Sequence, residues 1–113
     1  MQKKTFLLTI FTFFTLLIHV EISAQHTDIS SELVLLNVET GKEKVILHEQ
    51  RHFEAPNWSR DGKYLIINAR GKLEKVSVKG EHMGIIDTGF ADNCNNDHGL
   101  SFDGKWLIIS HND

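Results

Sequence analysis

The chain has 113 residues, with 12 Lys and Arg against 15 Asp and Glu and a formal net charge of −3. This length allows at most one ordinary domain of about 100–200 residues, which excludes an enzyme with separate cofactor and substrate domains. The weakly acidic balance provides no basic surface, so we expect no nucleic-acid partner. The single cysteine, Cys94, can form neither an intramolecular disulfide nor a cysteine-based zinc site.

Residues 1–24 have the features of a secretory signal peptide. Two lysines precede an apolar run from Thr5 to Val20, and Ile22-Ser23-Ala24 ends on a small residue suited to cleavage. A transmembrane anchor is the alternative, but the run is shorter than the ~20 residues that span a bilayer, and threonines dilute it. The pattern predicts a periplasmic or secreted chain whose mature domain is residues 25–113, with no membrane span after cleavage.

After the signal, the first predicted element is a β-hairpin, in which the apolar runs Leu33–Val38 and Val45–Leu47 flank a loop that contains glycine. Asp61-Gly62 then predicts a tight turn, because glycine accepts a positive φ. The turn leads into the apolar run Tyr64–Ile67. A run this short cannot form a buried helix, and it indicates a strand covered on both faces.

The same elements follow a second time. Lys75–Val78 and Met83–Ile86 predict another hairpin around a glycine, and Asp103-Gly104 precedes the apolar run Trp106–Ile109. We expect this run also to be covered on both faces. Sustained 3.6-residue periodicity is absent after residue 24, so we expect no helix there.

These elements recur at a fixed spacing. The segment Trp58–Lys63 returns 42 residues later as Leu100–Lys105, and the hairpin pattern that begins at Leu33 returns 40 residues later at Leu73. Such a period is typical of a β-propeller blade, whereas a β-sandwich, the alternative, would not require self-similarity. The sequence therefore predicts an all-β fold of about two four-stranded antiparallel blades of an incomplete β-propeller. The repeat is marked by Trp58, Ser59, Asp61, Gly62, Lys63, Ser101, Asp103, Gly104 and Lys105.

The segment from Ala55 to Ile67 resembles the WD40-like (PD40-type) repeat of TolB-type proteins, P-x-W-S-P-D-G-K-x-I-x-F, which also occurs in propellers of prolyl-oligopeptidase-type peptidases. The second copy keeps the S-x-D-G-K core, but it lacks the proline and has Leu100 in place of Trp. Arg60 and Phe102 stand where the family often has a second proline. The resemblance implies a secreted or periplasmic propeller that binds protein partners or a small ligand at its face, with no cofactor.

The most polar stretch, Asp92–Gly99, is expected to be an inter-blade loop where binding groups gather. Its oxygen atoms could hold a cation such as Ca²⁺, but the spacing does not fit an EF-hand, and Asn, Asp and Gly also simply form turns. We therefore predict no metal there. We expect its histidine at the surface and Trp58 and Trp106 packed between blades. The candidate ligand-facing residues are Asp92, Asn93, Asn95, Asn96, Asp97 and His98.

Catalytic residues are not predicted. Ser59 and Ser101 belong to the repeated turn, and the chain has no G-x-S-x-G nucleophile elbow. We expect a non-enzymatic, exported binding or protein-interaction scaffold of the cell envelope, forming the N-terminal part of a larger propeller. The alternative is the N-terminal propeller part of a secreted prolyl-oligopeptidase-like hydrolase or a lyase, with catalytic residues beyond Asp113.

Overall fold

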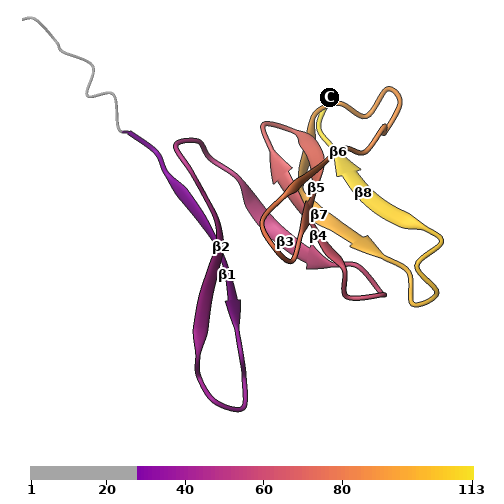
Figure 1. Cartoon of the computed structure of the whole chain (residues 1–113). Helices are drawn as coiled ribbons and strands as arrows, with labels where there is room; N and C mark the ends of the chain where they lie inside the picture. The colour runs from indigo at the N-terminus through magenta and orange to yellow at the C-terminus, as the bar shows by residue number, and fades with distance from the viewer. Residues whose placement is uncertain (1–27) are drawn as a thin grey trace, which may run out of the picture.

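The computed structural model describes residues 28–113, so the predicted signal peptide lies outside the described residues and stays a prediction. Within that range all regular structure is β, in three antiparallel sheets: a hairpin, a four-stranded sheet and a second hairpin (Figure 1). The all-β prediction is confirmed, and the strands divide into half, whole and half sheets. They are β1 (Ser31–Leu36), β2 (Glu43–Glu49), β3 (Glu54–Trp58), β4 (Tyr64–Ala69), β5 (Lys72–Ser77), β6 (His82–Ile85), β7 (Cys94–Leu100) and β8 (Leu107–His111).

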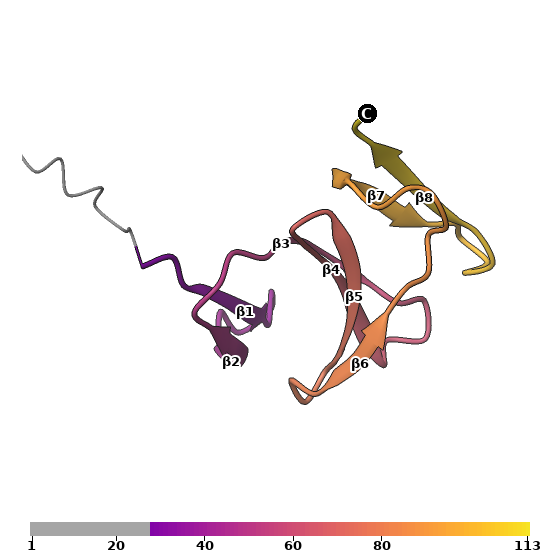
Figure 2. The same cartoon turned by 90° about the horizontal axis from the view of Figure 1, so that it is seen from above.

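The central sheet, ordered β3-β4-β5-β6, has a hairpin packed on each face (Figure 2). Strand β4 is buried on both faces, as its continuous apolar run predicts. Leu65 and Ile67 pack towards Leu33 of hairpin β1–β2. Ile66 points the other way and packs with Cys94 of hairpin β7–β8. The alternation of a strand thus places successive apolar residues in two separate cores.

The two S-x-D-G-K segments form tight turns with the same hydrogen bonds. The Ser59 hydroxyl donates to Asp61 Oδ1 over 2.7 Å and accepts from the Tyr64 amide over 3.1 Å. The Ser101 hydroxyl likewise donates to Asp103 Oδ1 over 2.6 Å. In each turn the bond from the serine lowers the pKa of the aspartate, and the next glycine has a φ of 70° or 72°. The repeated residues therefore build the turn, as their duplication predicts.

The second apolar run differs from the prediction. Trp106 lies just before β8, and Trp106 and Ile108 are exposed, so coverage on both faces is wrong for this strand. The reason is that only one face of hairpin β7–β8 has a sheet against it among residues 28–113. The prediction that both tryptophans pack between blades is also wrong. Trp106 is exposed, and Trp58, at the end of edge strand β3, is half exposed.

An ionic cluster joins hairpin β1–β2 to the central sheet. The Arg51 guanidinium donates two hydrogen bonds to the Glu74 carboxylate, over 2.9 and 2.8 Å, and a third to Glu49 over 2.7 Å. His82 Nε2 lies 2.9 Å from the other Glu49 oxygen. Burial raises the pKa of Glu49, but the hydrogen bonds from His82 and Arg51 outweigh it and the net shift is downward. Bidentate, partly buried pairs of this kind fix the relative position of two elements.

Candidate functional site

The polar stretch expected to be a loop is mostly a strand. Asp92 and Asn93 precede β7, whereas Asn95–His98 are part of it, so the loop prediction is wrong from residue 94 onward. The turn preference of these residues is overridden because Asn68 of the central sheet holds the backbone of β7 and the Asn95 side chain bonds across to β8. Asn95 Nδ2 donates to Ser110 Oγ of β8 over 2.9 Å, and Asn95 Oδ1 accepts from the Asp97 amide over 2.8 Å.

Hydrogen bonds from the central sheet fix β7 beside it. Asn68, buried at the end of the apolar run of β4, donates from Nδ2 to the carbonyls of Cys94 and Asn95, each over 2.8 Å. Asn57 of β3 donates to the carbonyl of His98 over 3.0 Å. Sequence reasoning missed these two anchors. The available signal was a polar residue at the end of a run that is otherwise apolar, which needs a partner when it is buried.

The strands that begin the two adjacent sheets, β3 and β7, are both irregular. The register of β3 shifts between Glu54 and Asn57, and that of β7 shifts between Cys94 and His98. Ala55, inside the first irregularity, has a φ of 54°, which is uncommon for a residue with a Cβ atom. Bulges and positive-φ residues occur preferentially near binding sites, where they redirect side chains.

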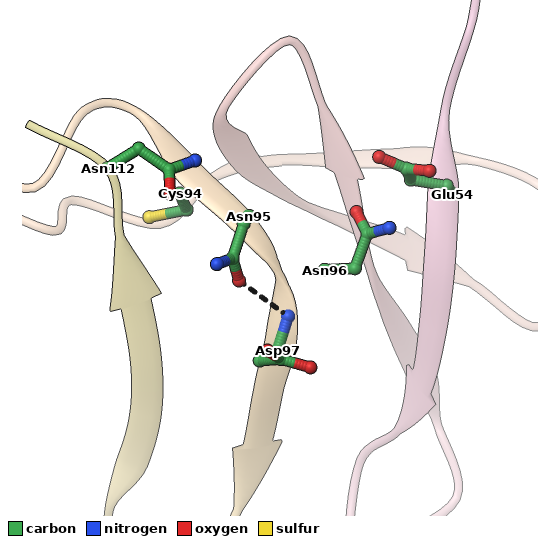
Figure 3. A pocket seen from close by; sticks show the side chains of 6 residues that line it. All are labelled: Glu54, Cys94, Asn95, Asn96, Asp97 and Asn112. Atoms are coloured by element: carbon green, nitrogen blue, oxygen red, sulfur yellow. Dashed lines mark hydrogen bonds between the residues drawn. The ribbon is translucent and has the colours of Figure 1, made fainter.

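A polar hollow of about 530 Å³ opens where these two irregular strands face each other. Glu54 of β3 and Asn96 of β7 point towards one another across the gap, with Asp97 one residue further along β7 (Figure 3). The hollow combines two carboxylates with three amides and has no lysine or arginine in its wall. This composition favours a ligand that offers N–H groups or positive charge. The lining residues are Glu54, Cys94, Asn95, Asn96, Asp97 and Asn112.

Three of the six predicted ligand-facing residues, Asn95, Asn96 and Asp97, therefore line the hollow. Asp92 instead lies 3.6 Å from Lys72 Nζ, and Asn93 Nδ2 donates to the Asn112 carbonyl over 3.0 Å. Glu54 and Asn112 were not predicted, because nothing in the sequence places the start of β3 and the end of β8 beside β7.

His98 is buried, and the expectation of a surface histidine is wrong. Its side chain packs towards β4, with Nε2 3.4 Å from the Ile66 carbonyl, and the residue is 8% exposed. No residue in the described range forms a hydrogen bond with its buried Nδ1 atom. His98 also borders a smaller hollow of about 360 Å³, together with Ile108 of β8.

Across residues 28–113, no three His, Cys, Asp or Glu side chains gather in an arrangement that could hold a metal ion. The same part of the chain contains no helix of the length and apolar character needed to cross a membrane.

The antiparallel sheets stack face to face, and the first strands of two of them, β3 and β7, lie side by side. With this arrangement the all-β chain resembles part of a TolB-like propeller protein. The solved structure described as "putative TolB from Agrobacterium tumefaciens" matches with a TM-score of 0.68 and 46% sequence identity, over 73% of this chain and 30% of that one. An uncharacterized protein of Agrobacterium fabrum is 47% identical over 81 residues, which make up 71% of this chain and 28% of that protein. The chain thus spans less than a third of either protein. No protein-family model matches it.

Proposed function

We propose that the chain is an exported, non-catalytic TolB-like scaffold that binds a protein segment at the hollow between β3 and β7. The observation that carries this proposal is the convergence of Glu54, Asn96 and Asp97 from two sheets onto one open, polar space. The likeness to the Agrobacterium TolB structure supports a TolB-like role, and the predicted signal peptide supports a place in the cell envelope.

The groups that could act as nucleophiles are used structurally, which supports a role in binding without catalysis. The hydroxyls of Ser59 and Ser101 donate to the aspartates of their own turns. Cys94 Sγ is buried and donates to the Ala91 carbonyl over 3.2 Å. A catalytic serine or cysteine would instead need a base oriented towards it and access to substrate.

The chemistry of the hollow identifies the kind of protein segment. Glu54 and Asp97 provide carboxylate acceptors, and the amides around them provide both donors and acceptors. The hollow is open, so the charges act through solvent and each contact with a lysine or arginine contributes about 1 kcal/mol or less. Affinity then comes from several such contacts made by an extended basic segment.

The test is a titration of the full chain with a lysine-rich peptide and a glutamate-rich peptide of equal length. We expect the basic peptide to bind and the acidic one not to bind. Asp97→Asn should weaken binding about fivefold, whereas Asp87→Asn, which neutralises an exposed acid outside the hollow, should leave it unchanged. Equal effects of the two variants would contradict the proposed site, and cleavage of the peptide would contradict a non-catalytic role.

Export is tested separately by fractionating cells that produce the chain and determining its N-terminus by mass spectrometry. We expect the chain outside the cytoplasm with Gln25 as its first residue. A chain that stays in the cytoplasm with Met1 intact would contradict export.

A further inference from the structure

The part of β7 that carries Asn96 and Asp97 has no partner in the ladder with β8. That ladder pairs Cys94 and then resumes at His98, and it gives no partner to the residues between them. A bulge of this kind disrupts the ladder locally and re-aims the side chains that it carries. Here Asn96 and Asp97 line the hollow (Figure 3).

Two asparagines of the central sheet hold this bulged segment at its ends. At one end, Asn68 donates to the carbonyls of Cys94 and Asn95, each over 2.8 Å. At the other end, Asn57 Nδ2 donates to the carbonyl of His98 over 3.0 Å. The residues that face the hollow from β7 therefore lie between two fixed points, both provided by the neighbouring sheet.

The Asn57 amide also contacts the opposite wall of the hollow. Its Nδ2 atom lies 3.4 Å from the carbonyl of Ala55, which follows Glu54 in the chain. The His98 carbonyl, its other acceptor, follows Asp97. One amide thus contacts the residues that follow both acids of the hollow. Ala55 needs such support, because a φ of 54° is uncommon for a residue with a Cβ atom and lies outside the extended range that a following proline favours.

The internal repeat separates Asn57 from the residues that the fold itself requires. Fold-building residues recur 42 residues apart, as Ser59 and Ser101 do in the two turns. The counterpart of Asn57 is Gly99, which has no side chain, and β7 is a strand with glycine at this position. The first strand of a sheet therefore does not need an asparagine there, and the amide serves the junction between β3 and β7.

The two carboxylates of the hollow come from different sheets, with Glu54 on β3 and Asp97 on β7. The lining residues include no lysine or arginine, so each carboxylate can accept from one basic group of a bound segment. Contact with both carboxylates at once requires that their separation match the spacing of the two basic groups. A wall that moves must be ordered on binding, which weakens that double contact.

We propose that Asn57 is a positioning residue, which holds the two walls of the hollow at one separation and makes the hollow selective for the spacing between two basic side chains. This inference rests on the proposed binding of a basic segment and adds which segments are preferred. A preorganised site loses less freedom on binding than a mobile one, so a segment that fits both carboxylates gains most. Without the amide, the hollow accepts basic segments with little regard to spacing.

The first experiment needs no ligand. Backbone amide relaxation, measured by NMR on the full chain, gives the order parameters of Asn96 and Asp97. We expect values of about 0.85 in the unchanged chain and a fall to about 0.6 or lower in Asn57→Ala. Asn37→Ala is the matched control, because Asn37 accepts from the amides of its own turn in hairpin β1–β2, and it should leave both values unchanged. Unchanged values in Asn57→Ala, or an equal fall in the control, would overturn the proposal.

The second experiment measures the affinity of the full chain for peptides of equal length and charge, each with two lysines separated by about one to four residues. We expect one spacing to bind about fivefold more tightly than the others, which is the gain from a second exposed ionic contact. Asn57→Ala should abolish this preference, whereas Asn57→Gln, which keeps an amide donor, should retain part of it. A loss of stability alone would lower the affinity for every peptide alike, since it changes only the folded fraction.

The outcomes separate this inference from the proposed function. If no basic peptide binds the unchanged chain, the proposed function fails, and the order parameters still decide whether Asn57 positions the walls. If peptides of every spacing bind the unchanged chain equally, binding of a basic segment stands and the selectivity is overturned. A preference for one spacing that Asn57→Ala retains would overturn the role of Asn57.

Discussion

Replacing Asn68 with alanine should detach β7 from the central sheet. Asn68 is 3% exposed, donates to the carbonyls of Cys94 and Asn95, and accepts from the amide of Gly71 over 3.0 Å. Alanine removes all three bonds at a site from which bulk water is excluded. The backbone bond from the Cys94 amide to the Gly71 carbonyl, 3.0 Å long, remains as the main link at this point.

The expected cost follows from the number of groups left without a partner. A buried polar group that loses its hydrogen bond costs about 1–3 kcal/mol, and one of the three carbonyl or amide groups here lies near the surface. We therefore expect a loss of about 3 kcal/mol in the free energy of unfolding, which is a large part of the stability of a chain this small.

Urea unfolding followed by far-UV circular dichroism measures this loss, since the regular structure of residues 28–113 is all β. All variants are compared at one protein concentration, because self-association would contribute to stability. Asn96→Ala is the control: Asn96 is exposed on the same strand, and its loss should change stability by about 0.5 kcal/mol or less. The reasoning is refuted if Asn68→Ala costs no more than this control.

Two further substitutions probe backbone geometry and charge. Gly71→Ala should cost more than Gly89→Ala in urea unfolding: both glycines have positive φ, but a Cβ at Gly71 would lie 2.9 Å from Asn93 Cα, whereas nothing lies within 4 Å at Gly89. Glu49→Gln should make the free energy of unfolding fall less steeply as the pH is lowered. Despite burial, hydrogen bonds lower the pKa of Glu49, so its contribution is present above the ordinary value of 4.5 and is lost as pH falls through the lower folded value. An unchanged pH profile of the urea midpoint would contradict this role.

The parts of the fold that the sequence predicts are those set by local chemistry. The Asp61-Gly62 and Asp103-Gly104 turns need a positive φ and a serine hydroxyl that donates to the aspartate, and both requirements are visible within five residues. The hairpins β1–β2 and β5–β6 were also predicted, because apolar runs on either side of a loop that contains glycine need no information from elsewhere in the chain. The central strand β4 follows from its unbroken apolar run.

The errors concern residues whose environment is set by distant segments. The stretch Asn95–His98 has the composition of a turn, and it becomes a strand because Asn68, far away in sequence, holds its backbone. Trp106 is a large aromatic residue of the kind that usually packs in a core, yet it is exposed. Residues 28–113 contain no second sheet that would cover its side of hairpin β7–β8. Only half of the residues that line the hollow were predicted, because the polar composition of β7 is visible in the sequence. The approach of β3 to β7, which adds Glu54, is not visible there.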